Sequence, residues 1–228
     1  IAAGTLFFAV IPPVAVVAAT STASGGFRRF FDEMAAGFKY LWQGQRMLFF
    51  MLCSFALVNF ALSPMGPLLP FIAEQRMGLD ATGFGFLLSS MTIGTMLGAA
   101  AISFFNRRLR RGLGDIWGIA GVGLALVAVA QLTSLVPAIA AFIIMGIALS
   151  VCSVSSNTLF QTLVPKEMQG RVFAVRGSIA QAAGPLGLAL VGALSVTVAP
   201  YTILSVGGTI VIIGGLIGYF VPGLAAAD

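Results

Sequence analysis

Residues 116–165 read IWGIAGVGLALVAVAQLTSLVPAIAAFIIMGIALSVCSVSSNTLFQTLVP, a stretch without a single charged side chain. An ionised side chain at the middle of a bilayer costs about 2.5–3.5 kcal/mol, and about 20 apolar residues are enough for a helix to cross the hydrocarbon. The stretch is therefore long enough for two membrane-spanning helices. The turn-forming residues 133–137 (TSLVP) in its middle predict where the chain reverses.

Other charge-free windows flank this stretch, at 1–27, 47–73, 81–106 and 177–227. The first three have room for one helix each, and the last has room for two, with a turn at 197–200. The sequence therefore predicts an all-α polytopic membrane protein with about seven transmembrane helices. Pro64, Pro67 and Pro70 further predict that the outer half of the second span is bent or broken, because proline removes a backbone donor.

The composition of the chain supports this class and excludes others. Of 228 residues, 59% are hydrophobic and 8% are charged, against about 25% charged in soluble domains. Histidine is absent, so mechanisms that need imidazole are excluded, and no catalytic residue, metal site or cofactor is expected. Cys53 and Cys152 both lie in apolar windows, so we expect no disulfide framework.

The basic residues predict the orientation of the chain. Of the twelve, all but Arg76 lie in the predicted loops 28–46, 107–115 and 166–176, which fall on one side of the membrane. The positive-inside rule makes that side cytoplasmic and leaves the C-terminus there. This clustering between spans is no nucleic-acid-binding stripe. Seven spans that end inside must begin outside. If the intact protein starts in the cytoplasm, we therefore expect an odd number of helices before Ile1, and five would give twelve.

These patterns divide the chain into four predicted parts. They are a transmembrane helix at 1–22, a cytoplasmic linker with an amphipathic helix at 23–46, a six-helix bundle at 47–222 and a cytoplasmic tail at 223–228. Glycines spaced for close helix contact are expected to hold the bundle together. They are Gly94 with Gly98, Gly184 with Gly187, and Gly214 with Gly218.

Several spans carry a one-sided polar stripe that could line a substrate pathway. The candidates are Asn59, Ser63, Ser89, Thr92, Ser150, Ser153, Asn157, Gln161 and Gln181. Hydrogen bonding between helices uses the same residue types, and for the serines and threonines we favour it. For the amides the two interpretations stand about even, because a buried amide without a partner is costly. No charged residue falls within a window, so the predicted cavity is uncharged and suits amphipathic or lipophilic cargo.

Residues 157–174, NTLFQTLVPKEMQGRVFA, resemble the loop between helices ten and eleven of major facilitator superfamily transporters, in the bacterial branch of drug and siderophore exporters. Residues 106–111 (NRRLRR) resemble the second copy of that superfamily's cytoplasmic arginine motif. The resemblance implies an inner-membrane protein of two six-helix bundles that exports a small molecule by alternating access. This chain would supply helices six to twelve.

The resemblance also identifies candidates for a cytoplasmic gating loop. They are Arg107, Arg110, Arg111, Gly170, Arg171 and Arg176. If transport is coupled to protons, we expect the titrating group in the helices before Ile1, because the spans of this chain contain no acidic residue at mid-membrane.

Other classes of seven-helix membrane protein fit less well. A retinal protein needs a lysine in its last span, and 203–221 has none. Intramembrane proteases and lipid transferases need histidine or clustered acids, which the spans lack. A receptor and a non-transporting membrane subunit both remain open.

The predicted topology can be tested by cysteine labelling of the intact protein in a background without Cys53 and Cys152. Ser134→Cys should react with an impermeant maleimide from outside the cell, whereas Leu109→Cys should react only after lysis, because the basic segments face the cytoplasm. The opposite labelling pattern would overturn the orientation.

Overall fold

A computed structural model describes residues 23–44, 46–105 and 110–227, which are helical over most of their length and contain no strand in these ranges. The helices are α1 (Ala23–Gly44), α2 (Arg46–Leu62), α3 (Met65–Met77), α4 (Ala81–Phe105), α5 (Arg111–Gln131), α6 (Leu135–Leu163), α7 (Lys166–Leu194) and α8 (Pro200–Ile217). The predicted all-α class is confirmed. The first predicted span, 1–22, lies outside the described residues.

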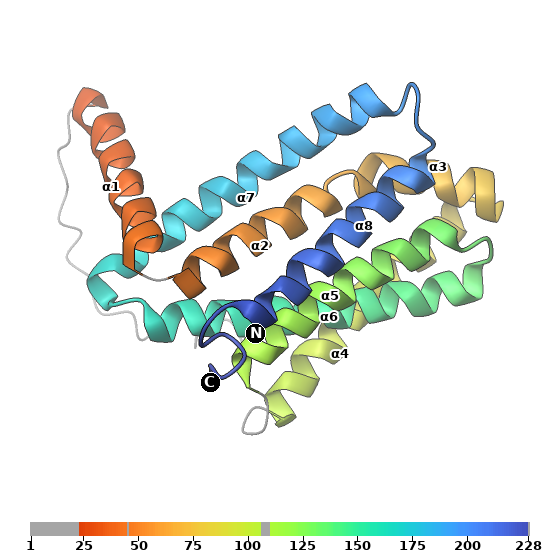
Figure 1. The fold of residues 1–228 in the computed structure, drawn as a ribbon. Coiled ribbons are helices and arrows are strands. Elements are labelled where there is room, and N and C mark those ends of the chain that lie inside the picture. The colour runs from red at the N-terminus through yellow and green to blue at the C-terminus, as the bar shows by residue number, and fades with distance from the viewer. Residues whose placement is uncertain (1–22, 45, 106–109, 228) are drawn as a thin grey trace, which may run out of the picture. The chain divides into compact units, whose positions relative to one another are not determined.

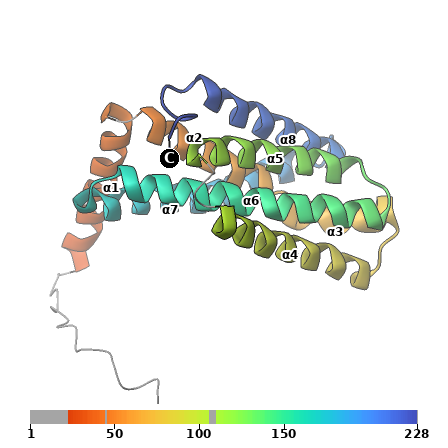
Figure 2. The ribbon, with the colours of Figure 1, turned by 90° about the horizontal axis from the view of Figure 1, so that it is seen from below.

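The chain divides into two compact units, 1–33 and 34–228. In the first, the described residues 23–33 form the opening turns of α1. In the second, the long helices lie in the order α4, α6, α5, α8, α2, α7, each packed on its neighbours in that series (Figures 1 and 2). The central α5 has 67% of its apolar window buried, whereas α4 and α7 at the edges have 28% and 17%. The described part of α1 also contacts α7, where Ser178 Oγ donates to Met34 Sδ at 3.4 Å and Gly37 lies against Arg171.

Five described helices, α4 to α8, are long and apolar enough to cross a membrane, and a sixth span results if the bent pair Asp32–Trp42 and Arg46–Leu62 is one span. The second predicted span is broken, as the prolines indicate: α2 ends at Leu62 and α3 begins at Met65, after a turn at Ser63 and Pro64. Pro70 lies inside α3.

The prediction that 166–176 is a loop is wrong. These residues form the first three turns of α7, which has 29 residues, more than the ~20 needed to cross the hydrocarbon. Residues 111–115 of the other predicted basic loop likewise open α5. Charge marks where a helix can leave the hydrocarbon, and the helix itself can continue there because its N–H and C=O groups remain paired within the helix.

The C-terminal residues fold back onto the start of α5. A 3-10 turn at Gly218–Phe220 ends α8, and Leu224 is fully buried. The backbone N–H of Gly112 donates to the carbonyl of Ala227 at 3.0 Å. Residues 224–227 therefore cover the N-terminal end of α5.

Glycines allow the closest helix contacts. A methyl group at Gly94 would overlap the backbone carbonyl of Ile143 in α6, and one at Gly98 would lie 2.8 Å from Ser150 Cβ. Gly187 lies against Ser63 and Gly218 against Ile116. These predicted contacts are confirmed. The expectation for Gly184 is wrong, since nothing lies within 4 Å of a methyl group there.

This contrast can be tested by two equal substitutions on α4. Gly94→Ala should lower the stability of the intact, detergent-purified protein by about 1–3 kcal/mol, because the added methyl group separates α4 from α6. Gly85→Ala, at a position with nothing within 4 Å, should leave stability unchanged or slightly raised, because alanine favours the helix. Thermal unfolding measures both, and equal effects would contradict the assignment of Gly94 to a helix contact.

Candidate substrate cavity

The polar stripe of α6 faces a cavity of 390 Å³ between α2, α4 and α6, here called the α2–α6 cavity. Most of its wall is apolar, and the polar lining side chains are Asn59, Thr95, Ser150 and Ser153. The Asn59 amide donates to the backbone carbonyl of Phe55 at 2.8 Å, which fixes its orientation. Three of the predicted pathway residues, Asn59, Ser150 and Ser153, therefore lie together.

A second cavity, of 230 Å³, adjoins the first. We call it the arginine cavity; its lining residues are Phe55, Ser153, Asn157, Phe173, Arg176, Gly177 and Ala180. Phe55 and Ser153 line both cavities. Asn157 lies on α6 one helical turn beyond Ser153, and its Nδ2 donates to Ser153 Oγ at 3.4 Å. A fourth predicted pathway residue thus joins the site.

Arg176 is the functional residue that the sequence interpretation misplaced. Its side chain is 4% exposed, and its Nη1 donates to Asn157 Oδ1 at 2.7 Å. The guanidinium Cζ lies 4.1 Å from the ring centroid of Phe55 and 4.9 Å from that of Phe160. The prediction of an uncharged cavity is therefore wrong. Apolar residues on both sides of Arg176 in the sequence were the signal that the helix already runs through this position.

The described residues include a second buried ionisable side chain. Asp115, on the second turn of α5, is 1% exposed. Its Oδ1 accepts a hydrogen bond from Cys152 Sγ at 3.6 Å, and its Oδ2 has no partner. Asp115 interacts electrostatically with Arg176. Asp115 and Arg176 directly precede the charge-free windows 116–165 and 177–227, and both belong to candidate spans, Asp115 to α5 and Arg176 to α7.

The other predicted pathway residues do not line these two cavities. Ser63 donates to the carbonyl of Phe60 at 2.9 Å beside the break between α2 and α3. The remaining side chains are exposed on their helices: Ser89, Thr92, Gln161 and Gln181. Periodicity placed Gln161 on the same stripe as Asn157, but it lies beyond the end of the arginine cavity.

The gating-loop candidates are dispersed. Arg110, Gly170 and Arg171 are exposed, and Arg171 Nη1 lies 3.8 Å from Met168 Sδ. Arg111 Nη1 donates to Thr158 Oγ1 of α6 at 3.2 Å. Gly170, Arg171 and Arg176 belong to helix α7 and form no loop, and Arg107 lies outside the described residues. A role in gating stays a prediction for this set.

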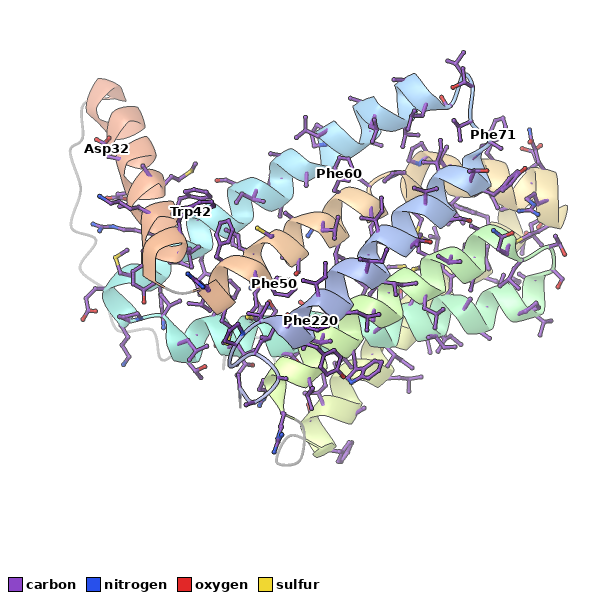
Figure 3. All side chains as sticks on the ribbon, in the orientation of Figure 1. Asp32, Trp42, Phe50, Phe60, Phe71 and Phe220 are labelled. Carbon is purple, nitrogen blue, oxygen red and sulfur yellow. The ribbon has the colours of Figure 1, made fainter. Side chains whose placement is uncertain are left out.

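A third cavity, of 290 Å³, lies between α2, α7 and α8. Its wall is almost wholly apolar and includes Phe60, labelled on α2 in Figure 3. None of the predicted pathway residues lines it. The polar chemistry of the described cavities is thus concentrated in the α2–α6 cavity and the arginine cavity.

Comparison of the sequence with known proteins identifies a family. The Major Facilitator Superfamily sequence profile matches residues 1–188. The chain is also 29% identical over 149 residues to a protein named "Multidrug efflux pump Tap" from Mycolicibacterium fortuitum. The aligned part covers 65% of this chain and 36% of that relative, so the chain spans about a third of the relative's length.

The hydrogen bond between Asn157 and Arg176 gives a testable difference between two amides of α6. Asn157→Leu should destabilise the intact protein by about 1–3 kcal/mol, because a buried guanidinium loses its acceptor. Gln161→Leu, one turn further along and exposed, should change stability by less than about 0.5 kcal/mol. Thermal unfolding in detergent compares the two variants, and similar losses would show that the hydrogen bond is not what stabilises this region.

Proposed function

Because the chain belongs to the major facilitator superfamily, we propose that the intact protein is a secondary active transporter of a bacterial inner membrane that exports a small amphipathic molecule by alternating access. The similarity to a protein named as a multidrug efflux pump supports export of drug-like cargo. The single observation that carries the proposal is the pair of adjoining cavities along α6, with few polar groups set in apolar and aromatic walls. Binding sites for small organic molecules have this composition.

Apolar side chains exposed on the two edge helices support the proposal that further helices of the same protein pack against this bundle. The two edge helices α4 and α7 bear large apolar side chains, among them Phe86, Met96, Leu186 and Leu188, which are all more than 40% exposed. We propose that helices encoded upstream, of which 1–22 is the last, form a first bundle that packs against the bundle described here. Residues 23–46 would then be the cytoplasmic linker, 47–222 the second bundle and 223–228 a cytoplasmic tail.

Ser153 offers a direct test, because it lines both polar cavities and its side chain is exposed. In cells that express the intact protein, Ser153→Trp should abolish most of the energised efflux of Nile red, an uncharged lipophilic dye, because the indole fills the shared part of the two cavities. The measurement is the rate at which dye fluorescence falls after the cells are energised, at matched membrane abundance.

A matched control places the same indole elsewhere. Leu124 of α5 is 62% exposed and lines none of the three cavities, so Leu124→Trp should retain efflux. Absence of energised efflux by the intact wild-type protein, or equal loss in both variants, would count against transport through these cavities.

A further inference from the structure

Arg176 contributes a positive charge to a wall that is otherwise neutral. The lining of the arginine cavity contains aromatic, small and amide or hydroxyl side chains, and Arg176 is its one charged member. Transfer of an unpaired charge out of water is expensive. A buried guanidinium in such a place therefore needs compensation from its surroundings.

The compensation that the described residues provide is incomplete. Nη1 donates to a neutral acceptor, Asn157 Oδ1, and the faces of Phe55 and Phe160 add cation–π attraction. Nε is buried and has no partner. Asp115 interacts with Arg176 electrostatically but does not line the cavity. The guanidinium is thus held in a fixed position, and the described residues give it no hydrogen bond to a carboxylate. A negative group that entered the cavity could supply that hydrogen bond.

We propose that the arginine cavity binds the single anionic group, such as a carboxylate, of an amphipathic molecule whose apolar part contacts Phe55 and Phe173. Arginine is suited to this because its planar fork matches the geometry of a carboxylate. This inference rests on the proposed transport function and assigns its substrate class. Cargo that carries one negative charge beside an aromatic or aliphatic body is favoured over neutral cargo of the same shape.

The adjoining cavity provides space for the rest of the molecule. The arginine cavity alone, at 230 Å³, is smaller than the ~300–1,000 Å³ of most small-molecule sites. The α2–α6 cavity adds 390 Å³ beyond the shared residues Phe55 and Ser153. Asn59 and Ser150 at its far wall can meet polar groups of the cargo. The anionic group would thus anchor one end of a longer ligand.

A purely structural role for Arg176, as a link between α6 and α7, makes different predictions. Asn157→Asp would strengthen such a link, because it gives Nη1 a charged acceptor at the same position. The same substitution would block the anion site, because the carboxylate at position 157 would bind the guanidinium in place of the ligand. For Asn157→Asp, the structural role predicts a more stable protein with its ligand preference unchanged. The binding role predicts loss of the preference for anionic ligands.

The experiment compares binding of 1-naphthaleneacetate and its uncharged amide, 1-naphthaleneacetamide, to the intact protein purified in detergent at neutral pH. Equilibrium binding of the tritiated compounds measures both affinities. The wild type should bind the carboxylate about 10-fold more tightly than the amide, the ratio expected for a charge-assisted hydrogen bond. Arg176→Gln and Asn157→Asp should each bring the ratio close to one while the affinity for the amide changes less than about 2-fold.

Lys166→Gln is the matched control, because it removes one positive charge at an exposed position of the same helix and should keep the wild-type ratio. No preference in the wild type, or a preference that survives in Arg176→Gln, would overturn the proposal. If Arg176→Gln does not fold, Asn157→Asp decides, and a retained preference there rejects the anion site. Efflux of Nile red by the wild type distinguishes failure of the anion-site proposal from failure of the transporter proposal. The dye carries no charge, so its transport does not require an anion site.

Discussion

Ionised side chains are costly in hydrocarbon, and this cost determines how the helices of the chain can be arranged. It keeps the long windows between the basic segments free of charge. It also requires that any charge left within a helix be compensated by other parts of the protein. The described residues compensate Arg176 and Asp115 only in part: Arg176 meets an amide and two aromatic rings, and one carboxylate oxygen of Asp115 meets the Cys152 thiol. Arg176 lies in the wall of the arginine cavity between α2, α6 and α7, whereas Asp115, on α5, lines neither polar cavity.

Much of the fold could be predicted from the absence of charge and from proline. The windows 81–106 and 116–165 correspond to α4 and to the pair α5 and α6, and the break after Leu62 follows from Pro64. Helix ends could not be predicted in the same way. Lys166 and Arg171 lie on exposed turns of α7, where charge is compatible with helix, so a rule that equates charge with loop places the start of α7 too late.

The candidate site was predictable in part, for a related reason. Helical periodicity correctly grouped Ser150, Ser153 and Asn157, because positions on one α6 face share an environment. Periodicity does not say which neighbour faces that stripe, so Gln161 was grouped with them although it lies outside the cavities. Arg176 could not be assigned from its own segment, because the aromatic ring of Phe55 that shields it comes from α2, distant in the chain. Its role depends on a tertiary contact.

The order of the helix row has a consequence for how the protein is made. Neighbours in the row are seldom neighbours in the sequence: α4 packs on α6, α5 packs on α8 as well as on α6, and α2 packs chiefly on α7 and α8. Synthesis proceeds from the N-terminus. Among the described helices, the glycine face of α4 therefore meets α6 only after α5 has been made, and α2 meets its main partners α7 and α8 last. We therefore expect the bundle to assemble late in synthesis, after its early helices have inserted into the lipid as separate spans.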